Sequence, residues 1–291
     1  MDNIIYAHEH VTIDLSGAKK DKDCRLDDRK LADNEFLKLK EANVCCIIDQ
    51  TCRGMGRNPR YAQSVADAAG VEIRHATGFY KEPFLPEECY TLSEDGIRDI
   101  FLSEIEKGID DTGIKASFIG EIGTSGDAIH AIEEKIFIGA CKAHAESGVA
   151  ICTHTTLGKL GLEQIEIFKR YSVDLEKVVL SHIDLSGNMD YMLRLLDTGI
   201  NIAFDTIGKN NYQPDSLRAT WLNELCERGY SSQIVASMDI TRRSNCLELG
   251  YNYLLDVFVP MLKNEHSFKV KWLEDILYTN PSGIYRIERK G

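Results

Sequence analysis

The sequence lacks any long apolar run, and no segment approaches the roughly 20 apolar residues that a helix needs to cross a bilayer. It also shows no basic N-terminal region followed by a long apolar stretch, as a secretory signal would require. Positive charge is scarce, because 34 lysines and arginines face 46 aspartates and glutamates, for a net charge of -12. Such a chain is repelled by nucleic acids and anionic membranes at long range. We therefore expect a cytoplasmic protein that binds neither nucleic acid nor a membrane.

The nine cysteines lack the paired C-x-x-C spacing of thiolate zinc sites and redox motifs. Their number is odd, and Cys45 and Cys46 are adjacent within an apolar run. These features are typical of reduced, buried thiols in a reducing compartment. They argue against a disulfide framework and against a cysteine zinc site.

Short runs rich in valine and isoleucine recur along the chain, most of them too continuous to have one solvated face. Between them, apolar residues recur at every third or fourth position, as in helices, and glycines such as Gly70 and Gly148 close several of these segments. The predicted strands are residues 4–10, 44–51, 71–79, 116–122, 149–155, 178–183, 200–206 and 234–239. The predicted helices are residues 33–42, 59–69, 93–107, 133–147, 162–171, 189–196 and 215–228.

This alternation continues without a linker rich in proline, glycine or serine. Eight strand–helix units over 291 residues predict a parallel (β/α)8 TIM barrel that forms a single domain over residues 1–291. The longest gap, residues 81–115, is expected to contain a loop followed by one helix. In such a barrel the carboxyl ends of all strands converge on one mouth, where active sites are built.

Six side chains that bind metals well are expected at the ends of five of these strands. His8 and His10 are two residues apart in a strand, so both point to the same side and can hold one cation together. The alternative is a buried polar network without metal, but six polar residues at one end of a barrel favour a site, because such residues are costly to bury unpaired. The six are His8, His10, Glu121, His154, His182 and Asp239.

Four imidazoles and two carboxylates exceed what one tetrahedral ion uses and suit two divalent ions that share a bridging carboxylate. We expect zinc, although manganese, cobalt, nickel and iron accept the same ligands. Two such ions lower the pKa of a shared water and polarise a carbonyl or phosphoryl oxygen. The expected chemistry is therefore hydrolysis.

Several motifs resemble those of the phosphotriesterase family of the amidohydrolase superfamily, and the resemblance covers essentially the full chain. Residues 13–17, 54–58, 204–210 and 239–244 are most similar to the phosphotriesterase homology proteins within that family. The metal-site motifs are Ala7-His8-Glu9-His10, Glu121-Ile122-Gly123-Thr124, Thr153-His154-Thr155, Ser181-His182 and Ser237-Met238-Asp239.

The resemblance implies a role for each ligand. One ion would be held by His8, His10, Glu121 and Asp239, and the other by Glu121, His154 and His182. Asp239 would be the catalytic residue that takes the proton from the attacking hydroxide. In better-known members the bridge is a lysine carboxylated by carbon dioxide, whereas this chain has Glu121 there, and Lys115, six residues earlier, would lie roughly 20 Å away.

Basic residues follow several of the predicted strands, although the chain as a whole is acidic. Together they favour an anionic substrate, a carboxylate or a phosphate. Each of them singly has the alternative of a solvated or ion-paired surface charge, and Tyr80, a candidate hydrogen-bond donor to a substrate carbonyl, has the alternative of packing. The candidate substrate-binding residues are Arg57, Tyr80, Lys209, Arg242 and Arg243.

We therefore expect a binuclear metal-dependent hydrolase of lactones or carboxylic esters, with an anionic or phosphorylated sugar lactone as the favoured small-molecule substrate. The alternatives are a phosphotriesterase acting on neutral organophosphate triesters, a mononuclear isomerase or decarboxylase, and a non-catalytic metal-binding scaffold. Metal stoichiometry separates the binuclear hydrolase from the mononuclear enzyme. The sequence leaves a homodimer open.

Overall fold

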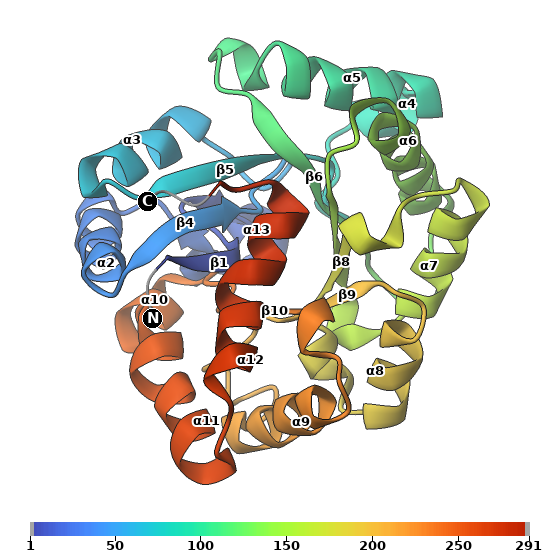
Figure 1. Cartoon of the computed structure of the whole chain (residues 1–291). Coiled ribbons are helices and arrows are strands. Elements are labelled where there is room, and N and C mark those ends of the chain that lie inside the picture. Colours follow the sequence, from blue (N-terminus) through green and yellow to red (C-terminus); the bar gives the residue numbers. More distant parts are fainter. Residues whose placement is uncertain (1–2, 289–291) are drawn as a thin grey trace.

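Eight parallel strands form the centre of the molecule in a computed structural model that describes residues 3–288. Each strand pairs in parallel with the next along the chain, and helices surround the ring (Figure 1). The strands are β1 (Ile4–Glu9), β4 (Val44–Asp49), β5 (Glu72–Thr77), β6 (Ala116–Thr124), β7 (Ile151–Thr155), β8 (Val178–Ser181), β9 (Asn201–Phe204) and β10 (Ile234–Ala236). All eight fall where strands were predicted.

The ring closes where β1 meets the segment after β10. The backbone N–H of Asp239 donates to the carbonyl of His8 at 3.2 Å, so the first and last strands of the barrel are joined at the carboxyl ends. The predicted (β/α)8 TIM barrel is confirmed as a nearly closed ring.

The seven predicted helices are all present, and their ends follow local capping rules. Asn58 and Asn188 accept backbone N–H groups at two amino ends, and Gly70 and Gly148 adopt the left-handed conformation at two carboxyl ends. None of the described helices is long and apolar enough to span a bilayer. These seven helices are α2 (Arg29–Glu41), α3 (Pro59–Ala69), α5 (Glu94–Glu106), α6 (Ala131–Ser147), α7 (Gly161–Arg170), α8 (Met189–Leu196) and α9 (Asp215–Glu227).

Two regions before β6 contain structure that was not predicted. The 81–115 segment has a short helix, α4 (Glu88–Thr91), before α5, so the prediction of one helix there was incomplete. Between β1 and α2, a small antiparallel hairpin of β2 (Ile13–Asp14) and β3 (Arg25–Leu26) encloses α1 (Ser16–Lys19). The hairpin is tied to the loop after β4, because Asp14 donates its N–H to the carbonyl of Met55 at 2.8 Å.

The last helix of the chain, α13 (Asn280–Tyr285), closes the amino end of the barrel. Ile284 and Tyr285 of α13 pack on inward-facing strand residues such as Ile5 and Phe118, and the Asn280 amide donates to the carbonyl of Ile234, the first residue of β10. In Figure 1, α13 (red) crosses the middle of the ring. The carboxyl end is thus the open one. Three further helices lie between β10 and α13, namely α10 (Arg243–Glu248), α11 (Val259–His266) and α12 (Val270–Glu274).

Candidate metal centre

The six predicted ligands meet at the carboxyl end of the barrel. His8 lies within β1 and His154 within β7, while His10, His182 and Asp239 follow β1, β8 and β10. Glu121 does not end its strand as predicted, because Ile122–Thr124 continue to pair with β7. All six are buried except His154, which is partly exposed to a cavity of about 360 Å³.

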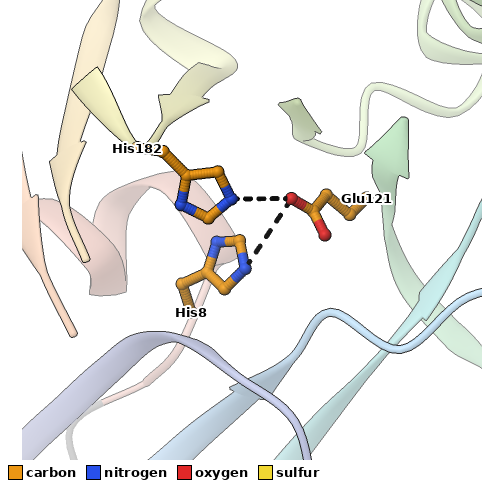
Figure 2. A group of neighbouring side chains, drawn as sticks. All are labelled: His8, Glu121 and His182. Atoms are coloured by element: carbon orange, nitrogen blue, oxygen red, sulfur yellow. Dashed lines mark hydrogen bonds and ion pairs between the residues drawn. The ribbon is translucent and has the colours of Figure 1, made fainter. Parts of the chain in front are cut away.

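Glu121 lies at the centre of one group of ligands. Its Oε1 is 2.8 Å from Nδ1 of His154, 3.1 Å from Nε2 of His182 and 3.9 Å from Nε2 of His8. Figure 2 shows this oxygen facing the rings of His8 and His182. A carboxylate oxygen aimed at three imidazole nitrogens is suited to share a cation with them.

Asp239 lies at the centre of a second group. Its Oδ1 is 3.5 Å from Nε2 of His8 and 3.3 Å from Nε2 of His10. Two sets of ligand atoms each lie within 4.8 Å of one another, one from His8, Glu121 and His182 and the other from His8, His10 and Asp239. The predicted pairing of His8 and His10 on one side of β1 is therefore present.

Hydrogen bonds outside the cluster fix which nitrogen of His10 and His154 carries the proton. The Thr51 hydroxyl donates to Asp49 at 2.7 Å, so it accepts from Nδ1–H of His10 at 2.9 Å. The Thr156 hydroxyl donates to a backbone carbonyl at 2.7 Å, so it accepts from Nε2–H of His154 at 3.2 Å. In each ring the remaining nitrogen, with its lone pair, faces the cluster.

Asp205 and Ser181 contact the outer nitrogens of the other two rings. Oδ1 of Asp205 accepts from Nδ1 of His182 at 2.9 Å, whereas Nδ1 of His8 lies 3.0 Å from the Ser181 hydroxyl and 3.1 Å from Oδ2 of Asp205. Oδ1 also accepts the backbone N–H of His182 at 2.9 Å, where that residue adopts a left-handed φ of 62°. Asp205 therefore holds the ring and the strained backbone of His182 in position and lies beside the ring of His8.

The buried nitrogen and oxygen atoms of the cluster are suited to bind a cation. Burial lowers the pKa of His154 to about 4, so this ring is neutral and its Nδ1 lone pair faces an oxygen of Glu121. Although burial raises the pKa of Glu121, the charge of His8 and the hydrogen bond from His182 hold it well below its usual range, which keeps Glu121 ionised. Nε2 of His8 is buried without a hydrogen-bond partner among the described residues. A cation bound among these nitrogen and oxygen atoms would supply the partner that Nε2 of His8 lacks.

Glu9 is a functional residue that the sequence reasoning missed. Its buried carboxylate accepts hydrogen bonds from the Ser237 hydroxyl at 2.7 Å and from the N–H groups of Met238 and Ile240 at 2.8 and 3.1 Å. These donors flank Asp239, whose φ of 49° is left-handed. The middle residue of the H-x-H motif thus holds the segment that carries Asp239.

Three of the five predicted substrate residues line the cavity. The Tyr80 hydroxyl lies 3.2 Å from Nδ1 of His154, Lys209 contacts both the carbonyl and the carboxylate of Asp239, and Arg242 pairs with Asp21 at 2.6 Å.

The other two predicted substrate residues do not line the cavity. The guanidinium of Arg57 is occupied by Glu104 and Asp110, at 2.6 and 2.8 Å, and that of Arg243 by Asp28 at 2.8 Å. Their ion pairs direct both side chains elsewhere, so the structure does not support a substrate-binding role for either. Conversely, Lys19 and Lys81 line the cavity, and only a fold could have shown that α1 brings Lys19 to the mouth.

Comparison with known proteins identifies the family. A model described as the phosphotriesterase family matches residues 3–285. The chain belongs to the phosphotriesterase family. The resemblance predicted from the motifs is confirmed.

Three relatives illustrate the range of the family. The phosphotriesterase homology protein of Escherichia coli K12 is 41% identical over 283 residues, 96% of this chain and 97% of the relative. Its crystal structure, with phosphate in the active site, has a TM-score of 0.93 and 40% identity over 97% of this chain and 98% of that one. A lactonase from Listeria monocytogenes is 25% identical with a TM-score of 0.92, covering 99% and 95%. An aryldialkylphosphatase from Saccharolobus solfataricus is 29% identical over 252 residues, 86% of this chain and 78% of the relative.

Membership of this phosphotriesterase family makes the protein a metal-dependent hydrolase related to phosphotriesterases and lactonases.

Proposed function

We propose that the protein is a binuclear hydrolase that opens a lactone or carboxylic ester carrying an anionic group. The observation that carries this proposal is the convergence of four imidazoles and two carboxylates on a cavity lined by basic side chains. The chemistry of those donors supports two ions, with Glu121 between them, and zinc as the metal.

The two groups of ligands suggest how two ions would be held. His8, His10 and Asp239 would hold one, and His154 and His182 the other, with Glu121 shared. Bound together, two divalent ions activate a water and polarise the substrate carbonyl.

The surrounding side chains have matching roles. Although burial raises the pKa of Asp239, the charge of Lys209 holds it well below its usual range. Asp239 is therefore ionised at neutral pH and available as the proton acceptor. Burial and the charge of Glu121 raise the pKa of Tyr80 well above its usual value. Its hydroxyl therefore keeps its proton and is available to donate to the substrate carbonyl.

The basic lining favours an anionic lactone over a neutral triester. Four cationic side chains, Lys19, Lys81, Lys209 and Arg242, line the cavity of a chain with a net charge of -12. The E. coli relative was crystallised with phosphate in its active site, and another relative is a lactonase. The relative named aryldialkylphosphatase makes organophosphate triesters the second candidate substrate class.

Two measurements test this function. Elemental analysis of metal-loaded protein should find two ions per chain, whereas one ion would favour a mononuclear isomerase or decarboxylase. A panel of plain and phosphorylated sugar lactones, aryl esters and dialkyl aryl phosphates is then compared by kcat/KM. The highest value is expected for an anionic lactone, and a higher value for the neutral triesters would overturn the choice of substrate. The cytoplasmic location and a homodimeric state stay predictions.

A further inference from the structure

Two lysines line the cavity without a carboxylate partner. Lys19 ends α1 and Lys81 follows β5, and their Nζ atoms lie 5.9 and 5.5 Å from the ring centroid of Phe84. The Nζ of Lys81 has one weak hydrogen bond, 3.5 Å long, to the carbonyl of Glu82. Among the described residues, neither Nζ has a carboxylate oxygen within 4.0 Å.

The other two cations of the cavity are already neutralised. Lys209 contacts the carboxylate of Asp239, and Arg242 pairs with Asp21 at 2.6 Å and with Asp23 at 3.3 Å. The unpaired positive charge of the cavity is therefore concentrated on Lys19 and Lys81, which we call the lysine pair.

Of the lysine pair, Lys81 is partly buried and Lys19 is exposed. Burial lowers the pKa of Lys81, against the opposite influence of Glu121, and the neighbouring charge of Lys19 lowers it further. Two like charges beside one aromatic ring repel each other unless an anion lies between them. An ion that accepted hydrogen bonds from both ammonium groups would remove this repulsion.

The position of the pair relates it to the ligand cluster. Tyr80 reaches the cluster with its hydroxyl, 3.2 Å from Nδ1 of His154, while the Nζ of Lys81 lies 5.4 Å from the centroid of the same ring. A substrate whose carbonyl lies at the ligand cluster would therefore place its other end near the lysine pair, at a distance of about one tyrosine side chain.

We propose that the lysine pair binds the terminal phosphate of a phosphorylated substrate. The inference rests on the proposed function, since it assigns the anionic end of that substrate to a place in the cavity. Two separate ammonium groups suit a phosphate, which carries nearly two negative charges and three acceptor oxygens. A carboxylate is matched better by the planar fork of an arginine.

The first test compares two lactones that differ only by a terminal phosphate, using the metal-loaded full chain. In Lys81→Met, and more so in the Lys19→Met/Lys81→Met double variant, the ratio of kcat/KM for the phosphorylated over the plain lactone should fall about tenfold or more. Lys81→Arg should restore most of the ratio because it restores the charge. The control Lys20→Met removes an adjacent exposed charge that does not line the cavity and should leave the ratio unchanged.

The second test does not depend on turnover. Isothermal titration with inorganic phosphate at constant ionic strength should give a Kd about tenfold weaker in the double variant than in wild type or Lys20→Met. If the double variant binds phosphate more weakly but the wild type turns over no lactone or ester, the phosphate-binding role of the lysine pair is supported and the proposed hydrolase function is overturned. Turnover of both lactones with an unchanged ratio and an unchanged phosphate Kd would overturn the lysine pair and leave that function.

Discussion

Glu9 joins two strands that are more than 200 residues apart in sequence. Its carboxylate is the acceptor for three donors on residues 237–240, the segment that presents Asp239. The alternation of a strand could predict that His8 and His10 point together. It could not predict what Glu9 would meet, because its partners are brought there only by closure of the barrel.

Replacing Glu9 by Gln should displace Asp239. An amide NH2 would face a donor on the 237–240 segment, and an unsatisfied buried donor costs about 1–3 kcal/mol. We expect a lower Tm, and a loss of kcat/KM of about tenfold. Thermal unfolding and steady-state kinetics check this, with the exposed Glu265→Gln as control. A Glu9→Gln variant indistinguishable from wild type would contradict the role given to Glu9.

Glu121 makes a prediction about metal loading. Because the proposed shared ligand Glu121 is itself a carboxylate, reconstitution should not need carbon dioxide. Metal content and activity after reconstitution should be equal with and without added bicarbonate, and a clear bicarbonate requirement would rule out a direct glutamate bridge.

Arg57 shows why the basic residues were hard to assign from sequence. Its sequence position after β4 indicated the mouth, but Glu104 and Asp110 lie 47 and 53 residues further on and occupy its guanidinium. Residue type predicted the six candidate ligands, because histidines and carboxylates at strand ends have few other uses. Lysines and arginines have many, and only tertiary contacts decide between them.

Glu104 makes stability depend on pH. Although burial raises its pKa, Arg57, Thr77 and Arg53 hold it below the usual value of 4.5. The charged form is therefore favoured in the folded state. Its contribution is present above pH 4.5 and is lost as the pH falls through the folded pKa. Glu104→Gln should reduce the free energy of unfolding at pH 7 more than at pH 3.5. Urea titrations at the two pH values measure this, and an equal loss at both would contradict it.

At the scale of elements, periodicity predicted the barrel well. Continuous apolar runs mark strands that are buried on both faces, and all eight were found. The helices after β10 were not predicted, because π-helical turns at Leu254–Phe258 and Asp275–Thr279 interrupt the α-helical periodicity. The packing of α13 on the amino end of the barrel depends on tertiary contacts, which the local sequence does not show. The predicted end of β6, residue 122, was also two residues too early. The strand continues to Thr124 because it keeps pairing with β7, and the local sequence does not indicate this pairing.

The closing helix α13 should support stability without touching the chemistry. Ile284 is 5% exposed and packs into the barrel interior, so Ile284→Ala should cost about 2–5 kcal/mol. The matched control is Val270→Ala in α12, where the side chain is 71% exposed and the change should be small. Urea unfolding checks the cost, and kcat/KM below the midpoint should stay near the wild-type value. A free energy of unfolding unchanged by Ile284→Ala would contradict this stabilising role of α13.

At the scale of the whole molecule, the ligand cluster connects five of the eight strands, β1, β6, β7, β8 and β10. Metals that bind only the folded chain should therefore stabilise all of it. At a free metal concentration about 1,000 times the Kd, the expected gain is about 4 kcal/mol. Chelation should lower the Tm, and the added metal should restore it. A Tm that does not respond to chelation would argue against ions at the cluster.

The contact between β1 and the segment after β10 also determines when the site can form during synthesis. Asp239 and the donors that Glu9 needs are synthesised more than 220 residues after His8 and His10. No nascent chain that stops short of the eighth strand can assemble this half of the cluster. The same contact makes the protein a natural candidate for splitting into two fragments, whose reunion would be reported by recovered metal binding.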